Sequence, residues 1–283
     1  MMESLGYRRY LCPIDQEPAT TEQGFLIPPT DRGIFQVNSH LVTLDSLNDR
    51  HCVVILGEPG IGKTTLLKSA EAAVNSANNP AVLAQYLSFN TIADTSDLNS
   101  RLTNSTNIAL WRINDGKLFL LLDALEEAVI PIQVLQERLA IALCLLPTDR
   151  LFVRIACRAT AWTTSFEQDV AQALQLAGGL PKFKLAPLTI GDIRAKAADM
   201  DVDPTLFIAN VQASEAVPLA AIPLTLQFLL NAFRLRGDLP RSKQLLYADA
   251  CARLSDEWDE NRNRPTAQAI TNNAQRVRIG MCQ

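Results

Sequence analysis

The sequence predicts an α/β protein with a doubly wound parallel sheet flanked by helices, followed by a smaller all-α region. From residue 51 to about residue 187, short apolar runs alternate with helical patterns, as expected for strands joined by right-handed crossovers. After Pro187 the strand-like runs stop, and prolines interrupt a series of helical patterns. A chain of 283 residues is long enough for both parts.

The expected division of the chain follows from these changes of pattern. The segments are a lead-in over 1–50, an α/β domain over 51–187, a helical domain over 188–262 and the start of a further domain over 263–283. Strands are expected at 52–56, 81–89, 118–122, 151–156 and 183–185. The run 118–122 is apolar throughout, which is typical of a central parallel strand buried on both faces.

Helices and short lead-in elements complete the expected secondary structure. Helices are expected from the glycine-rich loop to about residue 76, over 97–113 and over 132–145, with another beginning near Thr189. In the lead-in, 25–27 and 34–37 are candidate strands, and 41–47 is a candidate helix or strand.

A glycine-rich loop, GEPGIGKTT, lies between the first expected strand of the α/β domain and the helix after it. It matches the P-loop pattern G-x4-G-K-[ST], whose glycines let successive backbone N–H groups surround a phosphate at a helix N-terminus. Lys63 is a mobile charge for the β- and γ-phosphates, and the Thr64 hydroxyl can join a magnesium shell. The alternative is a glycine-rich turn before an ordinary helix. The residues expected to bind nucleotide here are Gly57, Glu58, Pro59, Gly60, Ile61, Gly62, Lys63, Thr64 and Thr65.

Acidic residues follow the strand 118–122: Asp123, then Glu126 and Glu127. We expect this strand to lie beside the P-loop strand, so that Asp123 holds magnesium together with Thr64. Either glutamate can orient or deprotonate a water that attacks the γ-phosphate. The alternative is an acidic start to the next helix, which the upstream P-loop makes less favoured.

An arginine, Arg158, follows the strand 151–156. At the end of the next strand it can contact the γ-phosphate and distinguish ATP from ADP. The alternative is a solvated charge on a loop. Arg154 lies inside the same strand, and the sequence indicates no role for it.

Composition excludes several classes of protein. The 26 Lys and Arg against 30 Asp and Glu give a formal net charge of -4, which argues against a chain that coats nucleic acid. No apolar run approaches the length of a membrane span, and no signal peptide precedes Pro13. Two histidines exclude a histidine-rich metal site, and six cysteines without a C-x-x-C pair are expected to be buried, reduced thiols of a cytoplasmic protein.

Together these residues resemble the NACHT-type ATPase domains of the STAND class of P-loop NTPases, found in bacterial defence and animal innate-immune receptors. The family combines the P-loop, a strand ending in D-[GA]-h-[DE]-E, a strand ending in Cys-Arg and a proline before an apolar helix. The corresponding residues are Gly57 to Thr64, Asp123 to Glu127, Cys157-Arg158 and Ile222 to Leu226. The resemblance covers about residues 40 to 265, and Ala124 and Glu126 stand where glycine and aspartate are commoner. The family's winged-helix and C-terminal sensor regions are expected to be missing.

The resemblance implies a nucleotide-operated switch in signal transduction or antiviral defence. ATP would favour an open state that forms homo-oligomers, ADP a closed one, and hydrolysis would be slow. Glu127, with Glu126 as the alternative, would orient water. Pro223 would contact the nucleotide from the helical domain; the other interpretation is that Pro223 simply begins a helix. An AAA-type motor or loader acting on nucleic acid and a nonhydrolysing nucleotide-binding scaffold are the alternative functions. No guanine-reading N-K-x-D motif follows the P-loop, so adenine is the expected base.

Overall fold

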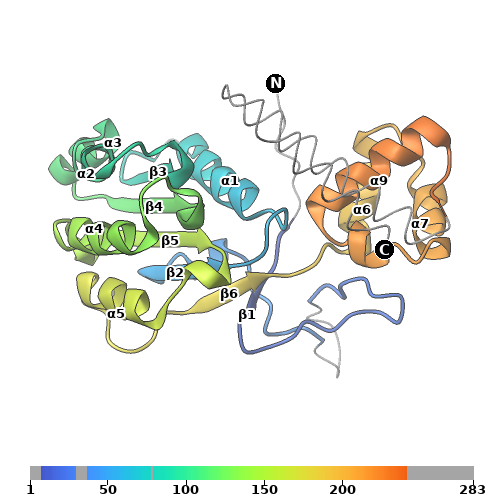
Figure 1. The fold of residues 1–283 in the computed structure, drawn as a ribbon, viewed down its shortest axis with the longest axis horizontal. Helices are drawn as coiled ribbons and strands as arrows, with labels where there is room; N and C mark the ends of the chain where they lie inside the picture. Colours follow the sequence, from blue (N-terminus) through green and yellow to red (C-terminus); the bar gives the residue numbers. More distant parts are fainter. Residues whose placement is uncertain (1–7, 30–36, 78, 241–283) are drawn as a thin grey trace, which may run out of the picture.

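The chain folds around a six-stranded sheet with the strand order β1-β6-β2-β5-β4-β3. The computed structural model describes residues 8–29, 37–77 and 79–240 (Figure 1). The strands are β1 (Leu11–Pro13), β2 (Cys52–Leu56), β3 (Val82–Ser88), β4 (Lys117–Asp123), β5 (Leu151–Cys157) and β6 (Lys182–Leu185). Helices cover both faces of this sheet, so the predicted α/β fold class is confirmed.

One edge of the sheet differs from the prediction of a wholly parallel sheet. β2, β3, β4, β5 and β6 pair in parallel, but β1 pairs with β6 in the antiparallel direction, with Leu11 opposite Leu185. The lead-in therefore contributes an edge strand that was not predicted. It is only three residues long and ends in a proline, which is tolerated at a sheet edge but gives no clear strand signal.

The order of the inner strands corrects a second prediction. β4, which ends in Asp123, does not lie beside the P-loop strand β2, because β5 lies between them. Leu56 pairs with Cys157, and Ala156 pairs with Asp123. The carboxyl ends of the three strands are therefore aligned, and Asp123 still reaches the P-loop side of the sheet across the end of β5.

The two faces of the sheet carry separate apolar layers. α1 (Lys63–Ser76) covers one face together with residues 44–47. The other face is covered by α2 (Thr95–Thr103), α3 (Thr106–Ile113), α4 (Ile132–Cys144) and α5 (Thr164–Ala173). All residues of β2 and β5 are buried, which accounts for the nearly continuous apolar runs in the sequence.

Arg154 of β5 is the largest polar side chain in this core, with 1% of its surface exposed. Its guanidinium donates hydrogen bonds to the carbonyls of Leu47 (2.8 Å), Arg50 (2.9 Å) and Val153 (3.0 Å) and lies 5.4 Å from the centre of the Phe119 ring. Burial lowers its pKa to about 10, so the group is still charged at neutral pH. Arg154 therefore fastens the turn before β2 to the middle of the sheet.

Several predicted local elements were wrong. The helix predicted over 97–113 is two helices, α2 and α3, and Asp94 caps the first by accepting hydrogen bonds from the N–H groups of Ser96 and Asp97. Residues 25–27 form no strand; Leu26 makes only isolated bridges, to Thr20 and Thr189. Within 41–47 the structure has the 3-10 helix Asp45–Leu47. The candidate strand 34–37 lies almost wholly outside the described residues.

A separate group of helices follows β6 (Figure 1). These are α6 (Ile190–Asp199), α7 (Pro204–Ala213), the short α8 (Val217–Ala220) and α9 (Pro223–Arg236). α6 begins with a capping box in which Thr189 and Asp192 bond each other's backbone N–H groups. The helices bury their own apolar cluster, which includes Phe207 and Phe233. The segment 263–283 lies outside the described residues.

Two composition-based expectations concern the described residues directly. No helix among them is long and apolar enough to cross a bilayer. Cys12, Cys52 and Cys157 are buried free thiols, whereas Cys144 is free but exposed, contrary to the expectation of buried cysteines. Burial raises the pKa of Cys52 and of Cys157 to about 12, which leaves both thiols protonated and unreactive at neutral pH.

Candidate functional site

The glycine-rich loop connects β2 to α1 with the backbone shape that its sequence requires. Gly60 and Gly62 have φ angles of 78° and 100°, in the left-handed region that side chains other than glycine rarely adopt. The N–H of Gly57 donates to the carbonyl of Cys157, at 3.2 Å. The loop is thereby held against the end of β5, and its last glycine directly precedes the first turn of α1.

Lys63 is buried at the start of α1, and its ammonium donates hydrogen bonds to the carbonyls of Gly57 and Glu58. Burial lowers the pKa of Lys63, while the charges of Glu126 and Asp123 act in the opposite direction. The ammonium is thus held inside the loop by two backbone acceptors and faces the acidic residues that follow β4. A phosphate placed in the loop would be a stronger, charged acceptor for the same donors.

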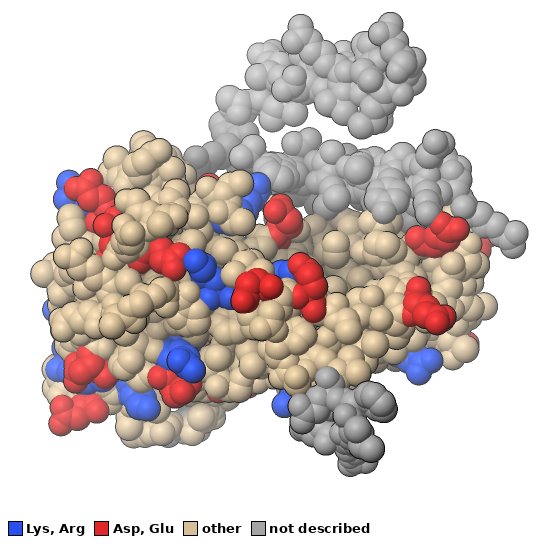
Figure 2. Space-filling model, turned by 90° about the horizontal axis from the view of Figure 1, so that it is seen from below, with Lys and Arg blue, Asp and Glu red and all other residues tan. Residues whose placement is uncertain are grey.

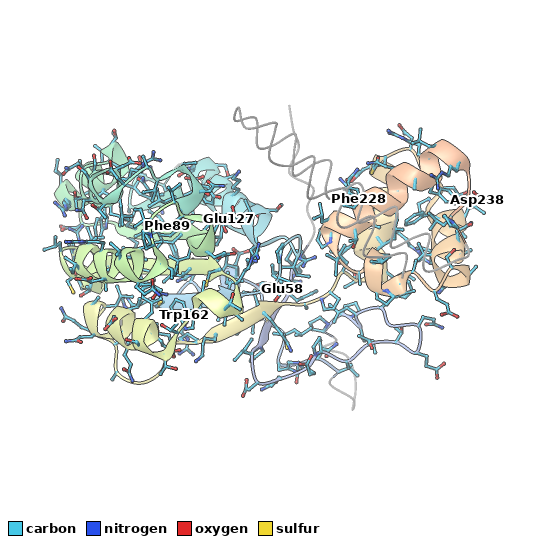
Figure 3. The ribbon with its side chains drawn as sticks, viewed as in Figure 1. Glu58, Phe89, Glu127, Trp162, Phe228 and Asp238 are labelled. Carbon is cyan, nitrogen blue, oxygen red and sulfur yellow. The ribbon has the colours of Figure 1, made fainter. Side chains whose placement is uncertain are left out.

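A cavity of about 380 Å³ lies at the carboxyl ends of β2, β4 and β5, within the usual size range of small-molecule sites. It is lined by Pro59, Gly60, Gly62, Lys63, Thr64, Thr65, Asp123, Ala124, Glu126, Glu127, Arg158, Pro223, Leu224 and Gln227. The structure therefore brings together the P-loop, the acidic residues, the arginine and the proline that were singled out from the sequence. Gly57, Glu58 and Ile61 do not line the cavity; Figure 3 shows Glu58 and Glu127 on the side of the sheet that faces the helical region.

Asp123 is the deepest acidic residue of the site, with 2% of its surface exposed. The hydroxyl of Tyr86 on β3 donates a hydrogen bond to its Oδ2, at 2.8 Å. Burial and this hydrogen bond raise the pKa of the Tyr86 phenol, which therefore remains a donor at neutral pH.

The oxygen ligands in this cavity fit a magnesium ion bound together with phosphates. Asp123 and Thr64 line the same cavity and offer a carboxylate and a hydroxyl, which are hard ligands of the type that Mg²⁺ prefers. In the described part of the chain no three His, Cys, Asp or Glu side chains form a metal cage of their own. Magnesium characteristically binds through one or two carboxylates plus substrate phosphates, so this donor set fits it.

The two glutamates have different surroundings. Glu126 Oε2 accepts the backbone N–H of Arg158 at 3.1 Å, and its Oε1 lies 3.3 Å from the Arg158 Nε in an ion pair. Glu127 is exposed, and its Oε2 faces the amide nitrogen of Asn90 at 3.4 Å. Glu126 therefore already holds Arg158, whereas Glu127 has only a weak partner at the edge of the cavity.

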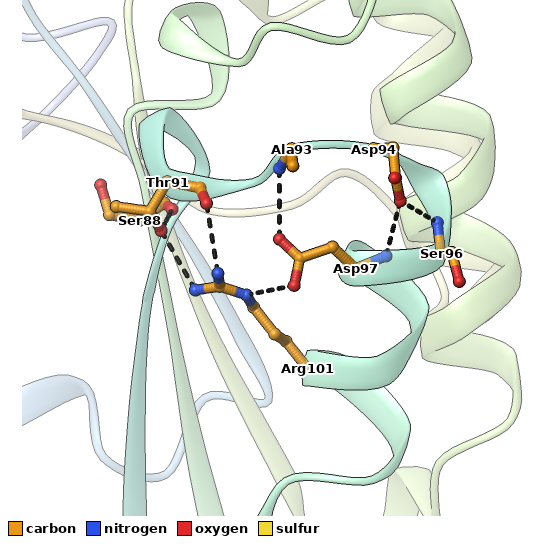
Figure 4. A network of polar contacts seen from close by, with 7 residues as sticks. All are labelled: Ser88, Thr91, Ala93, Asp94, Ser96, Asp97 and Arg101. Carbon is orange, nitrogen blue, oxygen red and sulfur yellow. Dashed lines mark hydrogen bonds and ion pairs between the residues drawn. The ribbon is translucent and has the colours of Figure 1, made fainter.

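A polar network fixes the segment that carries Asn90 (Figure 4). Arg101 of α2 donates to Asp97 (2.7 Å) and to the hydroxyl and carbonyl of Thr91 (both 3.2 Å). The Thr91 hydroxyl in turn donates to the carbonyl of Ser88, at 2.8 Å. The turn after β3 is thereby tied to α2, which places Asn90 opposite Glu127.

Ala124, directly after Asp123, has a φ angle of 59°, which explains why glycine would suit this position. We expect Ala124→Gly to change the free energy of unfolding by no more than about 0.5 kcal/mol, because relief of backbone strain offsets the greater entropy of the unfolded chain. Ala128→Gly is the matched control, because Ala128 has a φ of -63° and its substitution is expected to destabilise by about 0.5–1 kcal/mol. Equal losses in urea denaturation would contradict strain at Ala124.

The lead-in segment also contacts the P-loop. Arg9 donates from one nitrogen, Nη2, to the carbonyls of Ile61 and Ala186, each at 3.0 Å. It thus links the loop to the end of β6, where the chain leaves for the helical region. Burial lowers the pKa of Arg9 to about 10, and the charge of Asp192 partly opposes this.

α9 covers the P-loop from the other side. The N–H of Leu224 donates to the carbonyl of Gly60 at 3.3 Å, and a Cβ added to Gly62 would lie 3.6 Å from the Pro223 ring. Pro223 is the first residue of α9, a position where the missing N–H of proline is no loss. Tyr86, Asn90, Leu224 and Gln227 were not predicted as site residues. Leu224 lies within the proline motif and Gln227 lies one helical turn after Pro223, whereas Tyr86 and Asn90 enter through contacts between elements that no local motif encodes.

The contact between Gly60 and Leu224 predicts a specific clash. A Cβ on Gly60 would lie 2.7 Å from Leu224 Cδ2 and 2.8 Å from its Cβ, in addition to the strain at a positive φ. We expect Gly60→Ala to destabilise the protein by about 2 kcal/mol. Leu224→Ala in the same chain removes the contact with Cδ2 but keeps that with Cβ, and is expected to recover less than about 1 kcal/mol of the loss.

Gly178→Ala separates the clash from the strain, since Gly178 has a φ of 86° and nothing within 4 Å of the added Cβ. It is expected to cost only the backbone strain, about 1 kcal/mol. Urea denaturation of the four variants gives the comparison; equal losses for Gly60→Ala and Gly178→Ala would show that α9 does not rest on the loop.

Similarity to known proteins is found in the fold and not in the sequence. No family model matches the sequence, and no curated protein matches it. Among solved structures, the Walker-type ATPase paby2304 of Pyrococcus abyssi is similar with a TM-score of 0.51 at 13% identity, over 78% of this chain and 73% of that one.

Two further structures have lower TM-scores. Cdc6p from Pyrobaculum aerophilum matches over 68% of this chain, with a TM-score of 0.42 and 16% identity. The replication initiator DnaA bound to AMPPCP and single-stranded DNA matches over 66% of this chain, with a TM-score of 0.43 and 16% identity. The chain spans 57% and 56% of the lengths of these two proteins. The strand order, the glycine-rich loop between β2 and α1, and the similarity to the Walker-type ATPase identify the α/β part as a P-loop NTPase fold.

Proposed function

We propose that this protein binds ATP or ADP with magnesium in the cavity between the P-loop and α9, and hydrolyses ATP slowly. The observation that carries the proposal is that one cavity is lined by Lys63 and Thr64, by Asp123 and Glu127, and by Arg158. These are the groups that phosphoryl transfer needs: donors for phosphate, an oxygen ligand for metal, a base and a cation.

Each side chain has a defined task in this proposal. The loop N–H groups and Lys63 bind the β- and γ-phosphates, and Thr64 and Asp123 hold the metal. Bound magnesium supplies charge neutralisation at the phosphate oxygens. Glu127 orients a water molecule and accepts its proton. The water oxygen forms a bond to the γ-phosphorus while the bond from that phosphorus to the leaving oxygen of ADP breaks. Glu127 is the better base because Glu126 is engaged by Arg158.

Arg158 is the proposed γ-phosphate sensor. In the structure its Nε lies 3.3 Å from Glu126 Oε1, so the guanidinium can contact a γ-phosphate through its Nη groups, and the incoming phosphate would compete with Glu126 for this cation. ATP and ADP would therefore differ in how strongly Arg158 is held by Glu126, which links the nucleotide state to the end of β5.

We propose that the helical region moves relative to the α/β part when the nucleotide changes. The proposed boundaries are 188–262 for the helical domain and 51–187 for the α/β domain. Pro223 and Leu224 rest on Gly62 and Gly60, an arrangement that fits a closed state. ATP would favour an open state in which copies of the chain associate, as a STAND-type switch requires. A role in signal transduction or defence in the cytoplasm rests on the motif resemblance alone.

The direct test is nucleotide binding by the unmodified protein, measured by calorimetry with ATP, ADP and GTP, each with and without Mg²⁺. Binding of both adenine nucleotides in preference to GTP, strengthened by Mg²⁺ for ATP, is the expected result. Absence of adenine-nucleotide binding would overturn the proposal. Binding without phosphate release over hours would leave a nonhydrolysing scaffold as the function.

An AAA-type motor acting on nucleic acid would use the same cavity. Figure 2 shows acidic and basic side chains interspersed on one face of the molecule, with no continuous basic stripe among the described residues on that face. The formal net charge of -4 likewise gives no general attraction to nucleic acid. ATP hydrolysis stimulated severalfold by single-stranded DNA would favour the motor, whereas ATP-dependent association without an effect of DNA would favour the switch.

A further inference from the structure

We propose that Tyr86 is a positioning residue for the magnesium site, orienting Asp123 and tying it to the helix that carries Thr64. The inference rests on the proposed function, since it concerns the same metal site. Tyr86 itself does not line the cavity and is not expected to touch nucleotide or metal.

The pairing of β3 with β4 brings Tyr86 to Asp123. Tyr86 is opposite Leu121, and Ser88 is opposite Asp123, so Tyr86 and Asp123 are diagonal neighbours on the same face of the sheet. An aromatic side chain spans such a diagonal. The Tyr86 hydroxyl donates to Oδ2 of Asp123 at 2.8 Å, which fixes the rotation of the carboxylate. A fixed rotation also fixes how Asp123 presents its oxygens to the cavity that it lines.

Tyr86 is also fastened to α1, the helix that begins with Lys63 and Thr64. Its backbone N–H donates to Glu71 Oε1 at 2.9 Å, and the ammonium of Lys68 lies 5.4 Å from the centre of its ring. One residue therefore connects both elements that supply metal ligands. α1 already packs on the face of the sheet that includes β4, and Tyr86 adds polar contacts that help to keep Thr64 and Asp123 at a constant separation.

The expected size of the effect follows from the burial of the carboxylate. Asp123 is almost fully buried, so loss of the tyrosine hydroxyl leaves Oδ2 without its side-chain donor and frees the carboxylate to turn. Loss of such a supporting hydrogen bond characteristically weakens metal affinity by about 10–100-fold. The phosphate contacts of the P-loop do not pass through Tyr86 and should be unaffected.

The test is Tyr86→Phe, which removes only the hydroxyl and keeps the ring beside Lys68. Binding of a fluorescent ATP analogue is measured at increasing Mg²⁺ and, separately, in EDTA. We expect the half-saturating Mg²⁺ concentration to rise by about 10-fold or more, with nucleotide affinity in EDTA unchanged. Tyr10→Phe, the same change at a tyrosine of the lead-in, is the matched control, and Asp123→Asn gives the response to loss of the ligand itself.

Three outcomes would overturn the inference. An unchanged Mg²⁺ dependence in Tyr86→Phe would show that the hydroxyl does not support the site. Equal losses of affinity with Mg²⁺ and in EDTA would show a general structural role instead. If the unmodified protein bound no nucleotide, the proposed function would fail first, and the inference with it; normal Mg²⁺-dependent binding by the unmodified protein distinguishes the first two outcomes from this one.

Discussion

Lys63→Ala is expected to weaken the binding of both ATP and ADP by about 100-fold or more, because charge-assisted hydrogen bonds to phosphate in a buried site are worth several kcal/mol. Lys63 is the buried cation of the P-loop, and its ammonium is already held by the loop carbonyls. The substitution also removes the positive charge of the ammonium, which interacts with the carboxylates of Glu126 and Asp123. Calorimetric titration with each nucleotide measures the effect.

Lys117→Ala is the control for this variant. Lys117 is the first residue of β4, at the opposite end of the strand from Asp123, where its ammonium lies 5.1 Å from the Phe152 ring centre. Its removal is expected to leave nucleotide affinity within about 2-fold of the unmodified protein. Similar affinity losses in both variants would mean that the P-loop is not the nucleotide site.

Arg154→Ala is expected to lower the free energy of unfolding by about 3 kcal/mol. The substitution removes three hydrogen bonds from a charged donor to backbone carbonyls and leaves a void beside Phe119. The turn before β2 loses its connection to the sheet. Urea denaturation monitored by circular dichroism measures the change.

Two companion variants show which part of this loss is due to hydrogen bonding. Arg154→Met keeps most of the volume without the donors and is expected to recover about 1 kcal/mol of the loss. Arg112→Ala on α3 removes an exposed guanidinium with one long hydrogen bond, 3.5 Å to Leu145, and should cost less than about 0.5 kcal/mol. A loss at Arg154 no greater than that at Arg112 would contradict its role in anchoring the turn.

The parts of the fold that could be predicted from the sequence are those determined by local pattern. β2 was predicted with its observed bounds because the apolar run between His51 and Gly57 has clear limits. The capping residue Thr189 likewise marks the start of α6. The break between α2 and α3 was missed because the helical periodicity continues through Asn104 and Ser105, and only the turn between them ends it.

Strand neighbours and contacts between distant segments could not be predicted in this way. Periodicity gives the order of strands along the chain but not their order in the sheet, so the insertion of β5 between β2 and β4 was missed. The candidate site shows the same limit. Lys63 and Asp123 were found from motifs, whereas Tyr86 enters through the pairing of β3 with β4. Leu224 lies in the proline motif, but its contact with Gly60 follows only from the packing of α9 on the loop.

The position of Leu224 has a consequence for binding kinetics. Its side chain lies against Gly60, and its N–H is bonded to the Gly60 carbonyl, so the P-loop is covered on the side of α9. If phosphate enters by this side, α9 must first separate from the loop, and opening rather than collision limits the association rate at high nucleotide concentration. The observed rate would then rise to a plateau, and bound nucleotide would leave no faster than the helix lifts. In that case a bound nucleotide would be retained for as long as α9 stays on the loop.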